Sequence, residues 1–185
     1  MLYPAFLDLR GARAVVVGGG PVALRKTEGL LRAGAQVSVI APTVHPDLAA
    51  LNVGMQRRAF TPDDLRGARL VVAATDSDAV NDAVAAAARA VGAFVNHASQ
   101  PERGDLRLGA GLTRGPVQVS VSTGSELPML AQALRDWLDA ALPAELPLDA
   151  WAADRRAALA LSGEAREAAM QALRADIRAA LGVPA

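Results

Sequence analysis

A glycine-rich turn near the start of the chain has the residue types and spacing that bind a diphosphate. The run Gly18-Gly19-Gly20-Pro21-Val22-Ala23 fits the pattern Gly-x-Gly-x-x-Gly/Ala. In this pattern Gly18 makes the tight bend, Gly20 lets a pyrophosphate approach the backbone, and the small Ala23 lets the next helix pack closely on the strand. The amides that open that helix hold a phosphate without a basic side chain. The turn therefore predicts a dinucleotide site, and a tight turn that binds nothing is the alternative.

The residues on either side predict the elements that position this turn. Ala14 to Val17 is apolar and largely β-branched, which is typical of a strand buried on both faces of a parallel sheet. Val22 to Ala33 reads as a helix that Gly34 ends, and Gln36 to Ile40 reads as a second strand. We therefore expect a βαβ unit with the glycine turn at its first strand-to-helix junction, where Rossmann-like folds bind nucleotides.

Polar residues follow a further buried strand. Leu70 to Ala74 is apolar and ends at Thr75, while Phe94 to His97 predicts another strand. Ligands of open α/β sheets bind outside the carboxyl ends of the strands, so we expect the polar run Thr75-Asp76-Ser77-Asp78 to lie beside the nicotinamide half of the cofactor. Ser77 or Asp78 caps the helix that runs to Val91, and a capping role and a cofactor role at this strand end are compatible.

The loop after the second strand bears on the choice of cofactor. Its prolines, Pro42 and Pro46, exclude continuous regular structure, and in a dehydrogenase this loop meets the adenosine ribose. The acidic residue that usually binds the ribose hydroxyls is missing, and so is an arginine for a phosphate. We favour NAD over NADP, with Pro42 and Thr43 supplying backbone contacts. We expect His45 to be a loop residue and not a ligand.

The middle of the chain has a different pattern. Residues 105 to 111 and 117 to 122 alternate apolar with polar or small residues, which predicts strands with one open face joined by a turn at 114 to 116. Met55 to Phe60 is a further candidate strand, although two arginines interrupt it, and Thr61 with Pro62 predicts a helix start. A hydroxyl-rich run, residues 122 to 128, precedes a helix expected from Leu127 to Leu142, and such a helix start suits an anion.

The last part of the chain is rich in alanine and predicts helices. Leu148, Trp151 and Leu159 share a face of one helix. Met170, Leu173, Ile177 and Leu181 form an apolar stripe on the next. A lobe this short buries little by itself, so we expect it to dock on the first domain or on a second subunit.

Composition excludes several classes of protein. The chain has 185 residues, enough for one domain and an appendage, with 19 basic and 19 acidic residues. Without net charge there is no field to attract nucleic acid or an anionic membrane. No cysteine occurs, so disulfides and thiolate chemistry are excluded. No apolar run reaches membrane-spanning length and no leader is evident, which gives a cytoplasmic location by default.

Together these motifs resemble the sirohaem synthase N-terminal family. The resemblance covers nearly the whole chain and rests on residues 18 to 26, Ala73-Ala74-Thr75-Asp76, Asn81, Asn96, and Ser122-Thr123-Gly124 with Pro128 before a helix. It implies a precorrin-2 dehydrogenase that oxidises precorrin-2 to sirohydrochlorin with NAD. Some members also insert ferrous iron into sirohydrochlorin. The resemblance further implies a homodimer with intertwined central segments.

We therefore expect an α/β fold with a Rossmann-like parallel sheet, a central dimerisation segment and a small helical C-terminal module. Residues 1–112 would form the NAD-binding domain, residues 113–146 the dimerisation strand and helix, and residues 147–185 the helical module. The family's cofactor contacts fall on Pro21, Val22, Pro42 and Thr43. A serine that is phosphorylated in some relatives corresponds to Thr123, with Ser122 beside it.

The chain departs from the family at the catalytic aspartate, whose position falls on Ser99 in the motif Asn96-His97-Ala98-Ser99. A carboxylate accepts a proton or approaches a metal, whereas a serine hydroxyl does neither well. His97 projects to the same face of an extended segment as Ser99 and is one replacement base, a packed histidine being the alternative. Asp105 is a second candidate. We take Ser99 and His97 as the predicted catalytic positions.

The remaining site predictions concern the substrate. Precorrin-2 is a polycarboxylate, so Arg103, Arg107 and Arg114 are candidate partners for its acid groups, and solvated arginines are the alternative. The hydroxyls and amides of Ser122, Thr123 and Gly124 are a second candidate contact. Because Ser99 replaces the aspartate, a catalytically silent tetrapyrrole- or nucleotide-binding protein is the alternative function. An NAD-dependent dehydrogenase for another substrate is a third reading.

Overall fold

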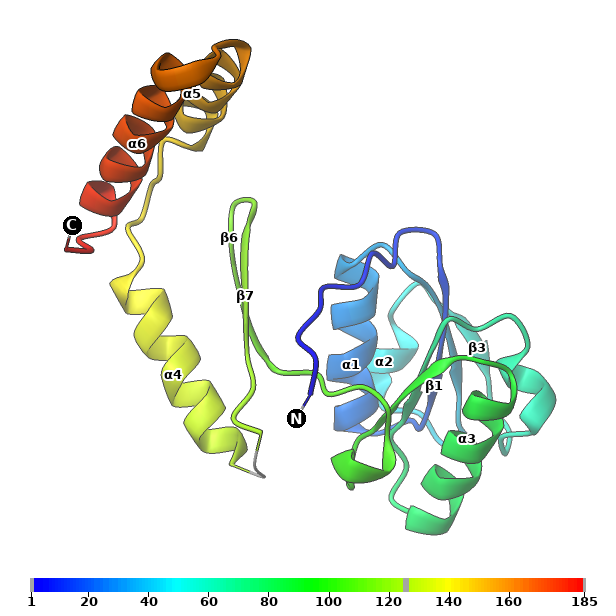
Figure 1. Ribbon diagram of the computed structural model, residues 1–185. Helices are drawn as coiled ribbons and strands as arrows, with labels where there is room; N and C mark the ends of the chain where they lie inside the picture. The colour runs from blue at the N-terminus through cyan, green and yellow to red at the C-terminus, as the bar shows by residue number, and fades with distance from the viewer. Residues whose placement is uncertain (1, 125–126, 185) are drawn as a thin grey trace. The chain divides into compact units, whose positions relative to one another are not determined.

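The chain folds into two compact units. The computed structural model describes residues 2–124 and 127–184. The first unit is Met1–Leu108 and the second is Gly109–Ala185. Figure 1 shows an α/β unit in the N-terminal half and a hairpin with helices in the C-terminal half. In the part of the chain that the structure describes, no helix is both long and apolar enough to cross a membrane.

The first unit is built on a parallel sheet whose strands run in the order β3-β2-β1-β4-β5. The strands are β1 (Arg13–Val17), β2 (Gln36–Ile40), β3 (Gly54–Gln56), β4 (Leu70–Ala73) and β5 (Phe94–His97). The helices are α1 (Pro21–Arg32), α2 (Pro46–Ala49) and α3 (Asp78–Ala90), with the short 3-10 turns η1 (Pro62–Leu65) and η2 (Pro101–Arg103). This confirms the predicted α/β class with a Rossmann-like sheet.

Strand β1 lies at the centre of the sheet and is buried on both faces. Val16 packs in a core cluster with Ala23 and Leu30 of α1. Val15 and Val17 pack in a second cluster that includes Val84, Ala85 and Ala88 of α3. Because both faces are covered, every position of the strand gains from an apolar side chain, at about 1.5 to 3 kcal/mol for a fully buried valine. This burial on both faces explains why the run Ala14 to Val17 is apolar throughout.

The order of the strands reverses between β1 and β4. From β1 the chain crosses through α1 to β2 on one side, while β4 and then β5 extend the sheet on the other side. Val17, the last residue of β1, pairs with Ile40 of β2 and Ala73 of β4. The carboxyl ends of these strands therefore meet at a topological switch point, where open α/β sheets bind their ligands.

Two sequence predictions about strands need correction. Strand β3 is Gly54–Gln56, so it shares only residues 55 and 56 with the expected 55–60 run. The run stops there because Arg58 turns to bind the carboxylate of Asp64. Residues 105 to 109 are not a strand either. The amides of Asp105 and Leu106 both donate to the Val95 carbonyl, at 2.8 and 3.0 Å, which a regular ladder does not permit.

The second unit begins with an antiparallel hairpin, β6 (Ala110–Arg114) and β7 (Val117–Val121). Its residues alternate between half-buried and exposed, as the predicted open face requires. Helix α4 (Pro128–Ala141) packs on both strands of the hairpin. The expected helix from Leu127 to Leu142 is thus confirmed to within one residue at each end.

Helices α5 (Leu148–Ala160) and α6 (Gly163–Ala180) pair with one another. Trp151 and Leu173 are buried between them, and the indole of Trp151 donates to the Asp176 carboxylate at 2.6 Å. Leu159, predicted for the same face as Trp151, is exposed, and Ala158 is buried in its place. The prediction fails because a spacing of eight from Trp151 overshoots the buried face, whereas a spacing of seven returns to it.

A buried carboxylate in the first unit gives a pH-dependent test of stability. The side chain of Asp64 accepts two hydrogen bonds from Arg58, and these, with the amide and hydroxyl of Thr61, lower its pKa from 3.8 to about 2 despite its burial. A group whose pKa is lowered by folding stabilises the fold above its unfolded pKa. That contribution is lost as the pH falls through the folded value.

We expect Asp64→Asn to lower the free energy of unfolding by about 1 to 2 kcal/mol at neutral pH. The difference from the unchanged protein should shrink as the pH falls from about 4 to about 2. Urea unfolding followed by circular dichroism at several pH values measures this. Asp63→Asn is the matched control, because the Asp63–Arg66 ion pair is exposed on both sides and should contribute less than about 0.5 kcal/mol. An equal loss in both variants would contradict the assignment.

Candidate functional site

The three glycines of the turn have different physical reasons to be glycine. Gly18 has φ +134°, and a Cβ there would lie 2.2 Å from the carbonyl oxygen of Ala74. A Cβ on Gly19 would lie 1.9 Å from the carbonyl oxygen of Thr43. Both contacts are impossible, so the chain's own packing requires these two glycines.

At position 20, by contrast, no contact within the described chain requires a glycine. Its φ is −87°, which any residue adopts. Apart from its chain neighbours, no atom of the described residues lies within 4 Å of where its Cβ would stand. A side chain there would enter open space in front of α1, the space that a diphosphate occupies in this type of turn. We call this open space, between Gly20 and the start of α1, the cradle. It fits the predicted dinucleotide.

The start of α1 is equipped to receive an anion. Gly20 is its N-cap residue and makes no side-chain cap, and Pro21 takes the first helical position. The first amides of a helix have no acceptor within the helix and lie at the positive end of its dipole. No acidic side chain stands in this first turn, and Val22 is exposed. The amides of Val22 and Ala23 therefore point a positive potential at the open cradle.

The loop after β2 lies directly against the glycine turn. The amide of His45 donates to the Gly19 carbonyl at 2.7 Å, and the Thr43 carbonyl abuts the Gly19 backbone. Pro42 and Thr43 are exposed beside this contact, where the sequence analysis expects them. The ring of His45 accepts a hydrogen bond from the amide of Asp47 at 3.3 Å and so caps α2.

The end of β4 is tied to α3 by one buried amide. Asn81 Oδ1 accepts from the amide and the hydroxyl of Thr75, at 3.0 and 2.8 Å, and Asn81 Nδ2 donates to the Thr75 carbonyl at 3.0 Å. Ser77 caps the helix through the amide of Val80. Ser77 is therefore the cap, while Thr75 is held at the carboxyl end of the strand, where the sequence analysis expects a cofactor contact.

Ser99 lies at the edge of a shallow pocket beside the glycine turn. The pocket is lined by Val22, Ala74, Thr75, Ala98 and Ser99. These residues come from the start of α1 and from the ends of β4 and β5, so the pocket lies at the switch point of the sheet. The hydroxyl of Ser99 donates to Asp78 Oδ1 at 2.9 Å. The pocket thus joins three of the sequence-predicted positions to a carboxylate.

His97 is close to Ser99 but is fully buried. Its Nδ1 lies 3.4 Å from Ser99 Oγ and accepts the amide hydrogen of Gln100 at 3.1 Å. Its Nε2 lies 3.4 Å from Asp82 Oδ1. Asp82 in turn binds Arg103 at 2.5 Å, and this contact is the main reason why the pKa of Asp82 is lowered. The imidazole of His97 therefore holds the loop after β5 in place. Ser99 is exposed, whereas His97 is not.

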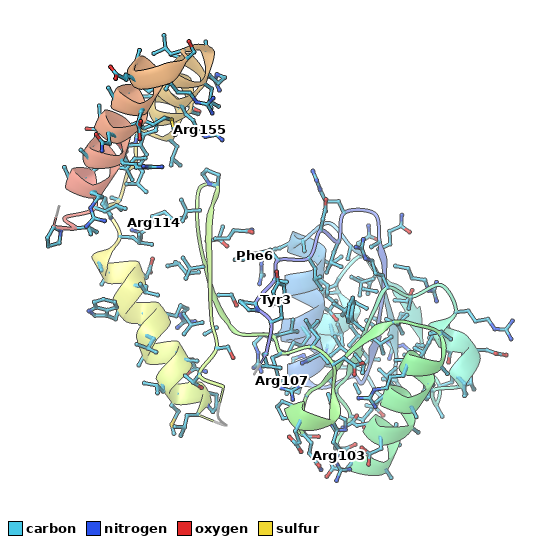
Figure 2. The ribbon with its side chains drawn as sticks, in the orientation of Figure 1. Tyr3, Phe6, Arg103, Arg107, Arg114 and Arg155 are labelled. Carbon is cyan, nitrogen blue, oxygen red and sulfur yellow. The ribbon has the colours of Figure 1, made fainter. Side chains whose placement is uncertain are left out.

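The remaining charged candidates lie in different surroundings. Asp105 binds Arg89 at 3.0 Å, in the last turn of α3. Arg89 is roughly 16 Å along the helix from Asp78, at 1.5 Å per residue. Figure 2 shows Arg103 and Arg107 on the first unit and Arg114 on the hairpin of the second. Arg107 donates one hydrogen bond to the Gly104 carbonyl at 3.0 Å, while Arg114 binds Asp139 and the carbonyls of Leu142 and Pro143 at the end of α4.

The hydroxyl-rich run after β7 belongs to the second unit. Ser122 and Gly124 are exposed, and Gly124 has φ +66° with open space at its Cβ position. Ser125 and Glu126, which belong to the same run, lie outside the described residues. A substrate contact at Ser122, Thr123 and Gly124 stays a prediction. Within residues 2–124 and 127–184, no three His, Asp or Glu side chains gather as a metal site would require.

Sequence reasoning missed the partner of Ser99. Asp78 is expected from the sequence as a helix cap or as part of the polar run at the cofactor end of the strand, but not as a partner of Ser99. Its carboxylate accepts from Ser99 Oγ and also from Gln100 Nε2 at 2.7 Å. The signal available in the sequence was an acidic residue at the start of the helix that follows β4. Its contact joins residues that are 21 apart in the chain, and periodicity does not reveal such a pair.

Comparisons with known proteins identify a nucleotide-binding family. Residues 5–110 match the family model described as "Putative NAD(P)-binding". A siroheme synthase of Nitrosomonas eutropha is 40% identical over 147 residues, 77% of this chain and 31% of that protein. One of Gluconacetobacter diazotrophicus is 43% identical over 152 residues, 78% of this chain and 32% of that protein. The chain thus spans less than a third of the length of these curated relatives.

A solved structure resembles nearly the whole chain. It is that of SirC, a precorrin-2 dehydrogenase, with a TM-score of 0.73 and 26% sequence identity. The likeness covers 94% of this chain and 88% of that one. It therefore extends beyond the nucleotide-binding sheet into the second unit.

The glycine analysis predicts two variants with opposite defects. Gly20→Val should weaken NAD binding by about tenfold or more, because its side chain fills the cradle while its backbone stays unstrained. The thermal midpoint should change little. Gly19→Ala should instead lower the thermal midpoint, because its Cβ would meet the Thr43 carbonyl. Calorimetry with NAD and a thermal melt measure both effects, and unchanged NAD affinity in Gly20→Val would contradict the cradle.

Proposed function

The chain belongs to the sirohaem synthase N-terminal family of NAD(P)-binding proteins, and we propose that it is a precorrin-2 dehydrogenase that oxidises precorrin-2 to sirohydrochlorin with NAD. The likeness to SirC over 94% of the chain is the observation that carries this proposal. We place this reaction in the cytoplasm.

The residues of the first unit have distinct parts in this proposal. NAD, when bound, supplies the acceptor for the hydride that leaves the macrocycle. Gly18 and Gly20 leave the backbone bare, and the amides of Val22 and Ala23 bind the diphosphate. Pro42 and Thr43 contact the adenosine half. Thr75 and Ser99 border the pocket at the switch point of the sheet, next to which the reacting ring would lie.

Substrate binding requires cations for the carboxylates of the macrocycle. Arg107 is half-buried and donates from Nη1 to the Gly104 carbonyl, so the other donors of its guanidinium are suited to a carboxylate. Arg103 is engaged by Asp82, and Arg114 by the end of α4. We therefore favour Arg107 among the three arginines, with Ser122, Thr123 and Gly124 as a second contact. Ferrous iron, where it is inserted, is a substrate and not a resident cofactor.

We also propose a homodimer formed through the second unit. Helix α4 buries Ala131 against the hairpin, but a second apolar stripe on the same helix is exposed, namely Leu127, Leu130, Leu134 and Trp137. Trp137 is 66% exposed. Tyr3 and Phe6, on the N-terminal segment of the first unit, are also exposed (Figure 2). An exposed apolar stripe such as the one along α4 marks a protein interface more often than a free surface.

The dehydrogenase is tested with the purified chain, precorrin-2 and NAD. We expect sirohydrochlorin to form with one NADH per macrocycle, and both products are followed by absorbance. Added ferrous iron then shows whether sirohaem follows. Binding of precorrin-2 without turnover would support the silent binding protein, and turnover of a different hydroxy or amino substrate alone would support another dehydrogenase.

The dimer is tested at the exposed stripe of α4. Trp137→Asp should shift the protein towards monomer by at least tenfold in the dissociation constant, because it places a charge in an apolar interface. Gln132→Asp, an exposed position on the same helix outside the stripe, should leave the association unchanged. Sedimentation equilibrium measures both. A monomeric unchanged protein, or a dimeric Trp137→Asp variant of equal affinity, would refute the interface.

A further inference from the structure

The hydroxyl of Ser99 has one proton, and the distances around it show where that proton lies. Asp78 Oδ1 is 2.9 Å from Ser99 Oγ, while His97 Nδ1 and Asn81 Nδ2 are each 3.4 Å away. Asn81 Nδ2 is a donor, and His97 Nδ1 already accepts the amide hydrogen of Gln100. The carboxylate is therefore the acceptor of the Ser99 proton. One lone pair of Ser99 Oγ accepts from Asn81 Nδ2 at 3.4 Å, and the other remains available to a group in the pocket.

Asp78 is held in place for this contact. It is the first residue of α3, and its second oxygen, Oδ2, accepts from Gln100 Nε2 at 2.7 Å. One donor on each carboxylate oxygen fixes the orientation of the group. Both donors come from the loop after β5, which His97 anchors through the amide of Gln100. His97 and Asp78 thus both bind the loop after β5 and fix its position.

The other carboxylates near Ser99 bind other partners, and His97 does not reach the pocket. His97 is fully buried, and its Nε2 lies 3.4 Å from Asp82 Oδ1 without a hydrogen bond among the described residues. Asp82 is engaged by Arg103, and Asp105 lies near the other end of α3 with Arg89. Among the described residues that approach Ser99, Asp78 is the one carboxylate in hydrogen-bond contact with its hydroxyl.

We propose that Asp78 gives Ser99 the basicity that a serine hydroxyl lacks. The inference rests on the proposed dehydrogenase function. The macrocycle loses two protons and two electrons in total. One hydrogen leaves with its electron pair as hydride, which reduces NAD.

The other hydrogen leaves as a proton to Ser99 Oγ, and the electron pair of its broken bond stays in the macrocycle. Ser99 passes its own proton to Asp78 Oδ1 at the same time, so the hydroxyl is restored and the carboxylate becomes protonated. Asp78 is exposed and returns the proton to water. Because it acts through Ser99, Asp78 is a positioning residue in this scheme. The family resemblance leads us to expect a carboxylate at position 99. In this chain Asp78 supplies that carboxylate through its hydrogen bond with Ser99.

The test compares variants that move or remove the carboxylate. We expect Asp78→Asn to lower kcat for precorrin-2 oxidation by about a hundredfold or more, within the range of general base catalysis. The KM for precorrin-2 should change less than about threefold. Ser99→Ala should lower kcat similarly. Combining it with Asp78→Asn should lower kcat little further, since each variant alone already breaks the proton relay from Ser99 to Asp78. Glu102→Gln, an exposed carboxylate-to-amide change three residues after Ser99, is the control and should keep kcat.

Rescue distinguishes the relay from a structural role. In the Asp78→Asn background, Ser99→Asp places a carboxylate on the pocket itself and should recover most of the lost kcat. Calorimetry with NAD and binding of sirohydrochlorin without turnover provide readouts that do not depend on activity. Both affinities should stay within about threefold in Asp78→Asn.

The outcomes separate this inference from the function on which it rests. Unchanged kcat in Asp78→Asn, or failure of the Ser99→Asp rescue, would overturn the relay while the unchanged protein still makes sirohydrochlorin. Loss of NAD affinity or of sirohydrochlorin binding in Asp78→Asn would also overturn it, because the residue would then be structural. If the unchanged protein oxidises no precorrin-2, the proposed function fails and the relay fails with it.

Discussion

The site depends on the close approach of bare backbone at the end of β1. A side chain at Gly18 would meet the Ala74 carbonyl, and one at Gly19 would meet the Thr43 carbonyl. Because both residues are glycines, the end of β4 and the loop after β2 lie directly against the turn that opens α1. The apolar burial of β1 on both faces brings the strand to this place, and the two glycines let its neighbours close around it. Gly20, one residue further, has open space at its Cβ position, and this is where we propose that the diphosphate binds.

Buried polar side chains hold the loops that surround this turn. Asn81 binds both the amide and the carbonyl of Thr75, and Asn96 Nδ2 donates to the Leu106 carbonyl at 3.0 Å. His97 accepts the amide of Gln100. A buried polar group without a partner costs about 1 to 3 kcal/mol, so each of these side chains favours one loop conformation over the alternatives. The pocket is therefore formed by exposed residues on a framework that polar contacts keep rigid.

The sequence predicts those parts of the fold in which one local rule decides. Strands β1, β2, β4 and β5 are recognised because burial on both faces requires an apolar run, and the glycine turn because its spacing reflects a fixed backbone geometry. Strand β3 and the segment from Asp105 are mispredicted because distant partners decide them: Arg58 leaves the ladder for Asp64, and Asp105 turns back to the Val95 carbonyl. The period of two correctly makes His97 and Ser99 neighbours, at 3.4 Å, but does not reveal that the imidazole is fully buried. The Asp78 contact is absent from any local pattern, since it forms only when the ends of β4 and β5 lie side by side.

A carboxylate at the first position of α3 meets two requirements at once. Negative charge in the first turn of a helix interacts favourably with the helix dipole, so Asp78 stabilises α3 whether or not it meets a substrate. The parallel pairing of β4 with β5 then brings the loop after β5 to the start of this helix. A serine at position 99 is long enough to reach that charge and short enough to keep its oxygen on the pocket. The chemistry of the site is therefore set by where a charge lies in space, and the side chain at position 99 is only one of the ways in which the fold delivers it.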